Sequence, residues 1–205
     1  MYKTIIFDLD GTLWDSTKQI KNVWSKIAKN YGLTINDNEI NKIMGFTKEE
    51  IVEYLFCDNK KNGEKFITEC QEEEVVYLSK YGGNIYSNTI STIEELSKKY
   101  ELYIVSNCQT GYIEAFLSYY NLNKYFKDYE CSGNTLKDKS FNIREIMKRN
   151  KILNAVYIGD TDKDYQATRQ ANIKFIWAKY GFGICKKYDF AIKDIKELIQ
   201  LKLED

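Results

Sequence analysis

The sequence predicts an α/β fold in which a doubly wound parallel sheet is interrupted by an inserted all-helical cap. Short apolar runs typical of buried strands alternate with helical segments over the second half of the chain. One further run of this kind opens the chain, and a long stretch with helical periodicity separates it from the others. These two observations predict a Rossmann-like core of residues 1–14 and 85–205 and a cap domain of residues 15–84.

The first strand is expected at Thr4–Phe7, a β-branched and aromatic run. Asp8 and Asp10 follow directly, and Gly11 allows the chain to turn sharply at that point. Over residues 16–81 the apolar positions recur at helical spacing, with no convincing strand between them. The first strand therefore ends in two carboxylates, and the helical cap follows it.

The second half of the chain alternates between helices and strands after a break at Gly82 and Gly83. The expected helices are residues 89–99, 112–120, 141–149 and 164–171, and the expected strands are residues 102–105, a short one around Tyr129, 155–158 and 175–177. Strands that alternate with helices at this spacing predict a parallel sheet with right-handed crossovers.

Composition and charge limit the partners of the protein. The 205 residues contain 30 Lys and Arg against 30 Asp and Glu, so neither a nucleic acid nor an anionic membrane is expected as a partner. The five cysteines show no CxxC spacing, which argues against a disulfide framework or a thiolate zinc site and fits a cytoplasmic protein. No apolar run is long enough for a membrane span or a signal peptide.

Polar residues close the apolar strands, and in a parallel sheet the carboxyl ends of the strands meet at one edge. Asp8 and Asp10 close the first strand, where one carboxylate can attack a substrate while the other manages protons. Ser106 and Asn107 close the next strand and can donate hydrogen bonds to phosphoryl oxygens. Because the chain has no histidine, carboxylates, lysines and hydroxyls must carry the chemistry.

A lysine and an acidic cluster complete this edge of the sheet. Lys137 and Lys139 lie near an expected helix start, and we favour Lys139 because it directly precedes Ser140, which could cap that helix. Asp160 and Asp164 follow a later strand, four residues apart, and offer the hard oxygen ligands that Mg²⁺ accepts. The sequence thus predicts a site with both a fixed cation and a carboxylate cluster.

Taken in order, the motifs DLDGT, VSN, a lysine and GDTDKD resemble those of the haloacid dehalogenase superfamily, in its phosphoglycolate phosphatase and β-phosphoglucomutase-like branch. The resemblance spans nearly the whole chain, and the order of the motifs is much more specific than any single match. It implies that Asp8 is a nucleophile that becomes transiently phosphorylated and that Asp10 is the general acid and base. It departs from the family at Lys139, where the usual Lys-Pro pair is Lys-Ser.

The resemblance also implies the binding groups. Lys139 is the catalytic charge clamp; the substrate-binding residues would be Thr12, Ser106, Asn107 and Lys48, and the Mg²⁺ ligands would be Asp8, Asp10, Asp160 and Asp164. Lys48 belongs to a cap loop, Gly45–Lys48, that resembles the specificity loop of this branch. It could bind an anionic leaving group or be an ordinary solvated lysine. Ser106, taken alone, could equally cap the helix that follows it.

We therefore expect a Mg²⁺-dependent phosphatase that hydrolyses a small phosphorylated metabolite, such as phosphoglycolate or a sugar phosphate, through an aspartyl phosphate on Asp8. A monomer or a homodimer would serve this chemistry. A β-phosphoglucomutase-like phosphosugar mutase is the alternative, although the cap histidine of those mutases has no counterpart here. A phosphorylatable signalling receiver also gathers aspartates and a lysine at strand ends, but it needs neither the helical insertion nor the DLDGT motif.

Overall fold

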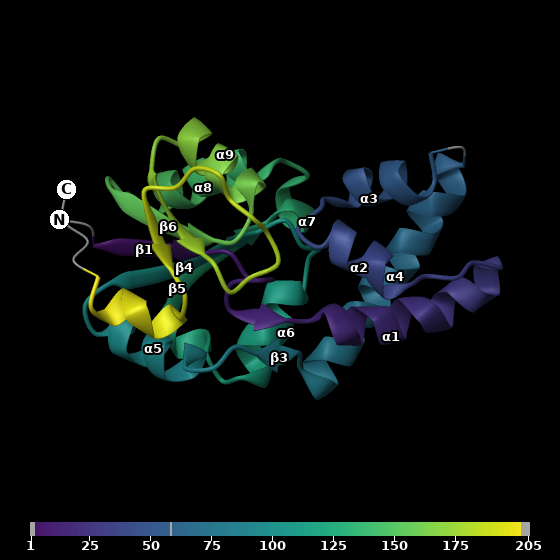
Figure 1. Cartoon of the computed structure of the whole chain (residues 1–205), viewed down its shortest axis with the longest axis horizontal. Coiled ribbons are helices and arrows are strands. Elements are labelled where there is room, and N and C mark those ends of the chain that lie inside the picture. The colour runs from purple at the N-terminus through teal and green to yellow at the C-terminus, as the bar shows by residue number, and fades with distance from the viewer. Residues whose placement is uncertain (1–2, 58, 202–205) are drawn as a thin grey trace.

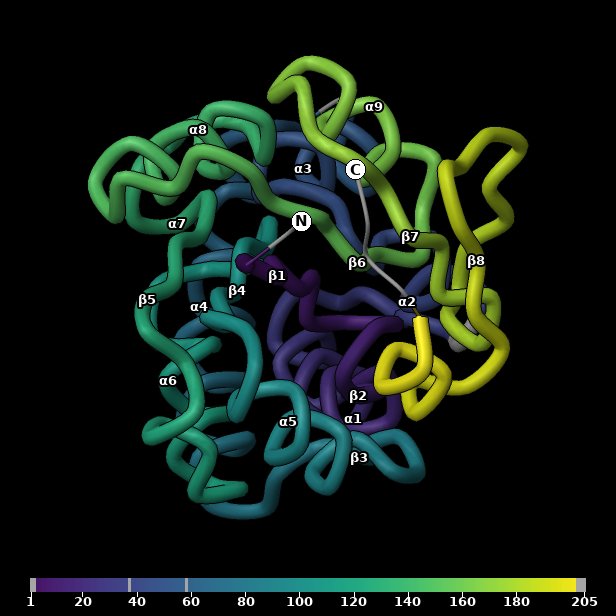
Figure 2. Tube along the Cα trace, turned by 90° about the vertical axis from the view of Figure 1, so that its left-hand side faces the viewer, coloured from purple at the N-terminus to yellow at the C-terminus, as the bar shows by residue number. Residues whose placement is uncertain are grey.

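A six-stranded parallel sheet forms the centre of the molecule, in strand order β5-β4-β1-β6-β7-β8. The computed structural model describes residues 3–57 and 59–201, without the side chain of Asp37. The strands are β1 (Thr4–Phe7), β4 (Glu101–Ser106), β5 (Phe126–Cys131), β6 (Ala155–Gly159), β7 (Lys174–Ala178) and β8 (Phe190–Ile192). Figure 2 shows the sheet with β5 at one side and β8 at the other.

Helices cover both faces of this sheet because successive side chains of each strand point to opposite sides. Ile5 and Phe7 pack in one cluster with apolar residues of the helices on that face, whereas Ile6 packs in another. The first face is covered by α5 (Thr89–Ser97), α6 (Tyr112–Tyr119) and the short η3 (Ile195–Ile199), and the second by α8 (Lys139–Arg149) and α9 (Asp162–Gln170). The predicted doubly wound α/β fold is confirmed.

A separate group of helices stands beyond the carboxyl ends of the strands (Figure 1). These helices are α1 (Thr17–Ala28), α2 (Asp37–Ile43), α3 (Lys48–Leu55) and α4 (Lys60–Tyr81), with the short η1 (Lys29–Tyr31) after α1. They have their own hydrophobic cluster, in which Trp24, Ile51 and Phe66 are buried. This helical group is called the cap below, and the remainder is called the core.

Two very short strands join the cap to the core. β2 (Trp14–Asp15) and β3 (Asn84–Ile85) pair as an antiparallel ribbon, with Trp14 opposite Ile85. The domain boundaries expected from the sequence, at 14/15 and 84/85, fall within this ribbon. The chain therefore enters and leaves the cap at adjacent points.

Two core helices, α8 and α9, begin two residues earlier than expected, whereas α5 and α6 begin at the expected residues. α8 begins at Lys139, and its N-cap is Asp138, whose carboxylate accepts a hydrogen bond of 2.8 Å from the Phe141 N–H. The expectation that Ser140 caps this helix is therefore wrong, because a better acceptor stands two residues earlier. Strand β8, the ribbon, the one-turn helix α7 (Ser132–Thr135) and η2 (Asn123–Tyr125) were also not expected.

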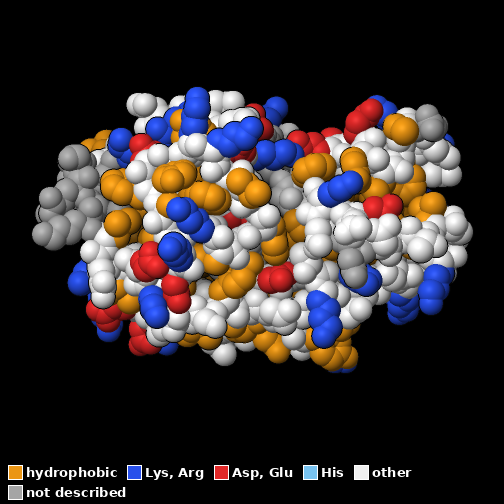
Figure 3. Space-filling model, in the orientation of Figure 1, with side chains coloured by type: hydrophobic (Ala, Val, Ile, Leu, Met, Phe, Trp, Pro, Cys, Tyr) orange, Lys and Arg blue, Asp and Glu red, His pale blue; other side chains and the backbone are white. Residues whose placement is uncertain are grey.

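On one face of the molecule (Figure 3), charged side chains of both signs are interspersed. On the face shown in Figure 3, Lys and Arg side chains lie over both the core and the cap, with Asp and Glu among them. In residues 3–57 and 59–201, no helix combines the length and the apolar character that a crossing of the bilayer requires.

Candidate active site

Three buried carboxylates meet at the carboxyl edge of the sheet. Asp8 follows β1, Asp160 follows β6, and Asp164 lies in the first turn of α9. The two strands are neighbours, with Phe7 level with Ile158, so their ends bring Asp8 and Asp160 together. One oxygen from each of the three carboxylates can be chosen so that all lie within 4.8 Å of one another.

Lys139 supplies a buried positive charge to this cluster. Its Nζ lies 2.9 Å from Asp8 Oδ1 and 2.5 Å from Asp164 Oδ1. It donates a hydrogen bond to Asp164, whereas its contact with Asp8 is a close ion pair without hydrogen-bond alignment. Burial alone would lower the pKa of this ammonium, but the charges of Asp164 and Asp8 hold the pKa well above its ordinary value. Lys137, the other candidate, is exposed.

Backbone and hydroxyl donors fix the remaining oxygens of the cluster. Asp164 Oδ2 accepts hydrogen bonds from the Thr161 N–H at 2.9 Å and the Thr161 hydroxyl at 2.7 Å. Asp160 Oδ2 accepts them from the N–H groups of Phe182, at 2.7 Å, and Gly183, at 3.2 Å. Asp8 Oδ1 and Asp160 Oδ1, however, are buried and have no hydrogen-bond partner in the described part of the chain. Such oxygens are costly unless something else binds them.

Mg²⁺ fits this donor set. Burial raises the pKa of Asp8 to about 7, opposed by Lys139 and reinforced by Asp164. Burial also raises the pKa of Asp160 well above its usual range, and the charges of Asp164 and Asp8 add to the effect. Three carboxylates against one ammonium leave an excess of negative charge, which a hard divalent cation would neutralise. Asp8 and Asp160 would hold the ion, with Asp164 in support.

The turn after β1 needs a glycine at position 11, because the acidic cluster lies too close to leave room for a side chain. The φ of Gly11 is +77°, in the region that favours glycine, and a Cβ at this position would collide with the carboxylate of Asp160. The glycine of the DLDGT motif thus allows the first loop to approach the loop after β6. This close approach brings the two parts of the acidic cluster together.

The carboxylate of Asp10 lies apart from the acidic cluster, against two hydroxyl groups. Asp10 Oδ1 is 2.7 Å from the Ser16 Oγ and 2.9 Å from the Tyr112 hydroxyl, each placed to donate to it. Burial raises the pKa of Asp10 to about 6, and the hydrogen bonds from Ser16 and Tyr112 oppose that rise. A pKa near neutrality suits a group that both gives and takes a proton. Its role as a metal ligand stays a prediction.

The expected substrate-binding residues occupy different places. Ser106 is buried at the end of β4, and Asn107 donates a hydrogen bond of 3.0 Å to the Gly45 carbonyl of the cap. Thr12 is fully buried, and its hydroxyl has no partner in the described residues. Lys48 opens α3 in the cap, and its Nζ donates to the Thr68 hydroxyl at 2.6 Å.

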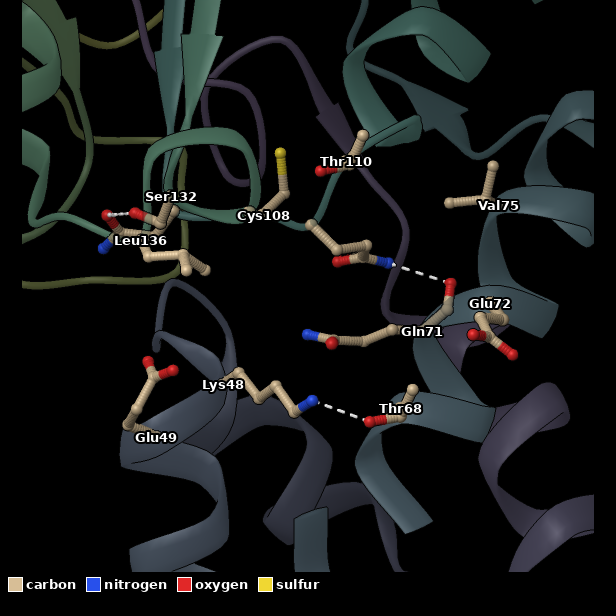
Figure 4. Close-up of a pocket in the computed structure, with 13 residues that line it drawn as sticks. Lys48, Glu49, Thr68, Gln71, Glu72, Val75, Cys108, Thr110, Ser132 and Leu136 are labelled. Atoms are coloured by element: carbon tan, nitrogen blue, oxygen red, sulfur yellow. Dashed lines mark hydrogen bonds between the residues drawn. The ribbon is translucent and has the colours of Figure 1, made fainter. Parts of the chain in front are cut away.

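Three cavities lie where the cap meets the core, and one of them, of about 190 Å³, has Glu50 of the cap and Lys139 and Lys163 of the core in its wall. The inner cavity, of about 50 Å³, is lined by Asp10, Ser106 and Tyr112 from the core and by Trp24, Gly45 and Glu74 from the cap. The outer cavity, of about 450 Å³, includes Lys48, Thr68, Gln71, Asn107, Gln109 and Thr110 in its wall. Figure 4 shows the outer cavity, with Lys48 pointing toward Thr68. Residues of both the cap and the core therefore line the space next to Asp10.

Sequence reasoning missed several residues of this region. Ser16, Tyr112, Glu74 and Gln109 all line or support the cavities, yet each lies in or beside a helix with no motif around it. Thr161 could have been found from the sequence, because Thr161 and Asp164 form a capping box with its usual three-residue spacing. The others become visible only when the cap is folded over the core.

The fold and this site define a class: a doubly wound α/β protein with buried carboxylates and one lysine gathered at the carboxyl edge of its sheet. Residues 5–178 match the family model described as haloacid dehalogenase-like hydrolase, and the chain belongs to that family. A phosphoglycolate phosphatase of Aquifex aeolicus is 30% identical over 210 residues, covering 97% of this chain and 96% of the relative. The predicted family and enzyme class are confirmed.

Further relatives agree with the family. A pyrophosphatase, PpaX, of Oceanobacillus iheyensis is 24% identical, covering 97% of this chain and 96% of that protein. Among solved structures, a putative haloacid dehalogenase-like hydrolase from Bacteroides fragilis superposes with a TM-score of 0.86 at 23% identity, covering 97% of this chain and all of that one. The structural likeness supports the fold of the core and the cap alike.

Proposed function

We propose that this hydrolase is a Mg²⁺-dependent phosphatase that cleaves a small phosphomonoester through an aspartyl phosphate on Asp8. The observation that carries the proposal is the buried carboxylate of Asp8, whose Oδ1 forms an ion pair of 2.9 Å with Lys139 at the end of a central strand and within a converging carboxylate cluster. A carboxylate in this position can form a bond to phosphorus while its surroundings balance the charge of the phosphoryl group.

In the first step a carboxylate oxygen of Asp8 forms a bond to phosphorus as the bond from phosphorus to the leaving oxygen breaks. Lys139 stays ionised throughout and offsets the negative charge of the phosphoryl oxygens. Asp10, in its protonated form, gives its proton to the leaving oxygen, so the alcohol departs as a neutral molecule. Mg²⁺, when bound, supplies further positive charge to the phosphoryl group.

In the second step Asp10, now ionised, takes a proton from a water molecule as the water oxygen attacks phosphorus. The bond between phosphorus and Asp8 breaks, which releases phosphate and restores the carboxylate. Ser16 and Tyr112 hold the Asp10 carboxylate in one orientation for both proton transfers. A pKa of about 6 lets Asp10 alternate between its two forms near neutral pH.

The names of the relatives support a phosphoric ester as substrate. The Aquifex aeolicus protein is named a phosphoglycolate phosphatase and the Oceanobacillus iheyensis protein a pyrophosphatase, so substrates differ among relatives of similar length. The shared part is phosphoryl transfer to water, and the cavities under the cap would select the leaving group. A small metabolite fits these enclosed spaces.

Phosphate release from a panel of small phosphomonoesters, with Mg²⁺ or with a chelator, tests the proposal. We expect release that requires Mg²⁺, that turns over many times per enzyme, and that Asp8→Asn abolishes. Isolation of the denatured enzyme during turnover of a ³²P-labelled ester should show label bound to protein, and none in the variant. Turnover that survives in Asp8→Asn would refute the nucleophilic role.

A further inference from the structure

We infer that Glu74 determines specificity by excluding anionic leaving groups, so that the substrate carries a hydroxyl or an ammonium group next to its phosphate. This inference rests on the proposed function and concerns the leaving group alone. It departs from the name of the Aquifex aeolicus relative, whose stated substrate carries a carboxylate.

Glu74 is a buried carboxylate on the cap helix α4, with 4% of its surface exposed. It lines the inner cavity together with Asp10, the proposed proton donor. One oxygen accepts a hydrogen bond from the indole N–H of Trp24, in the cap, and the other accepts one of 2.6 Å from the side-chain amide of Gln109, in the core. The carboxylate is therefore fixed at the boundary between the two domains.

The partners of Glu74 are neutral, which distinguishes it from the carboxylates of the acidic cluster. Among the described residues that line the inner cavity, none is a lysine or an arginine, and the charged ones are Asp10 and Glu74. A carboxylate has about four acceptor positions, and Trp24 and Gln109 fill two of them. Glu74 can thus accept a hydrogen bond from a donor on the substrate.

At pH 8, where the specificity assays belong, most of the Glu74 carboxyl is ionised because burial raises its pKa only to about 7, and an anion in the inner cavity would meet that charge without a counter-charge. Separation from water strengthens such repulsion, because the effective dielectric constant under the cap is far below that of bulk water. A substrate hydroxyl or ammonium group would instead donate to a carboxylate that is already desolvated. The same buried group therefore penalises one class of leaving group and binds the other.

Lys48 does not reverse this balance. Its Nζ is hydrogen-bonded to Thr68 in the wall of the outer cavity, and Glu49 and Glu72 line the same cavity. Figure 4 shows these side chains around one space, with the lysine directed at the threonine. Lys48 does not line the inner cavity, so it supplies no positive charge to balance Glu74 there. Selection of the leaving group therefore depends on the buried glutamate rather than on these more exposed groups.

Three esters of matched size test the inference: 2-phosphoglycolate, 2-hydroxyethyl phosphate and O-phosphoethanolamine, whose two-carbon leaving groups are anionic, neutral and cationic. We expect kcat/KM for the neutral and cationic esters to exceed that for 2-phosphoglycolate by about 10-fold or more. Glu74→Gln should reduce this ratio by about 10-fold, mainly by raising kcat/KM for 2-phosphoglycolate. Glu73→Gln removes the same charge from an exposed neighbour on α4 and should leave the ratio as it is.

A wild-type preference for 2-phosphoglycolate would overturn the inference, as would a ratio that Glu74→Gln does not change. Turnover of an aryl phosphate with none of the three esters cleaved would also overturn it, while the proposed phosphatase function would stand. Loss of 2-phosphoglycolate activity in Lys48→Met, with the other two esters unaffected, would assign selection of the leaving group to Lys48 instead. Absence of Mg²⁺-dependent release from any ester, aryl phosphate included, would refute the proposed function itself.

Discussion

The molecule buries carboxylates in two regions that treat negative charge differently. At the edge of the sheet, Asp8 and Asp164 share the ammonium of Lys139, and backbone N–H groups bind the carboxylate of Asp160. At the boundary between cap and core, Glu74 has an indole and an amide as its partners. Both regions are almost completely closed to water.

The difference separates two tasks. Charge at the sheet edge is partly compensated by the fixed ammonium of Lys139, which opposes the rise in the pKa of Asp8, so Asp8 can receive a phosphoryl group there. Charge at the boundary is not compensated, so its presence depends on pH and on the group beside it. Chemistry is thereby assigned to the core, and selection of the leaving group to the contact between cap and core.

The largest expected effect is the difference in kcat between two isosteric substitutions, one in each region. Asp8→Asn should lower kcat by at least about 10⁴-fold, because an amide cannot act as the nucleophile. Glu74→Gln should lower kcat for 2-hydroxyethyl phosphate by less than about 10-fold, since that side chain forms no bond to phosphorus. Steady-state phosphate release from both variants measures the difference. Equal losses would end the proposed division of tasks.

Removal of the Lys139 ammonium should show how much it contributes to the stability of the folded protein. Lys139→Met leaves Asp8 and Asp164 buried without compensation, and we expect a loss of about 3–5 kcal/mol in the free energy of unfolding. Addition of Mg²⁺ should recover part of that loss, because the ion binds the folded state. Urea unfolding with and without Mg²⁺ provides the measurement. A variant as stable as the wild type in the absence of Mg²⁺ would contradict this account.

The buried Glu74 at the boundary should make the free energy of unfolding depend on pH. Burial raises the pKa of Glu74 to about 7 from 4.5, so between these values the folded state holds a proton that the unfolded state has released. The Glu74 contribution to stability is therefore fully present below about pH 4.5 and is lost as the pH rises to about 7, by at most about 3 kcal/mol. Glu74→Gln should flatten this part of the wild-type curve.

The pH experiment needs an internal reference, since Asp8, Asp10 and Asp160 also have raised pKa values. The relevant quantity is the difference in unfolding free energy between Glu74→Gln and the wild type, measured at several pH values from 5 to 8. Glu73→Gln is the matched control and should track the wild type throughout. A difference that does not vary with pH would place Glu74 outside the titrating groups.

The smallest expected effect concerns an exposed contact between cap and core. Lys163 of α9 lies 2.6 Å from Glu50 of α3, both about half exposed, and its ammonium sits over the ring of Phe46. Exposed ion pairs of this kind contribute about 1 kcal/mol or less. Lys163→Met should change kcat/KM by less than about 5-fold, with a smaller change still at high salt. A loss of 100-fold would mean that this exposed contact is needed to hold the cap over the active site.

Much of the core could be predicted from the sequence. The apolar runs identified β1, β4, β6 and β7, and the edge rule for parallel strands brought Asp8, Asp160 and Asp164 together before any coordinates. Lys139 was favoured because Ser140 was expected to cap the helix, and that reason failed. Asp138 and Ser140 both have capping side chains, and local sequence alone could not show which of them accepts from Phe141.

Much less of the contact between cap and core could be predicted from the sequence. Glu72, Glu73 and Glu74 are consecutive in the sequence, yet Glu74 is buried while its two neighbours are exposed. Nothing in the local pattern distinguishes them, because the direction of a helix face is decided by the domain on which it packs. Tyr112 was missed because its contact with Asp10 joins residues 102 positions apart, whereas Ser16, only six positions from Asp10, was missed because no motif marks it.

The paired strands β2 and β3 have a consequence for how such a protein can change over evolution. Because Trp14 lies opposite Ile85, the chain enters and leaves the cap at one narrow neck, and the acidic cluster and Lys139 all come from outside the cap. A different helical module, or a short hairpin turn, could replace the cap at this neck without a change in the strand order of the sheet. New substrate preferences could then arise by exchange of a modular lid rather than by remodelling of the catalytic machinery.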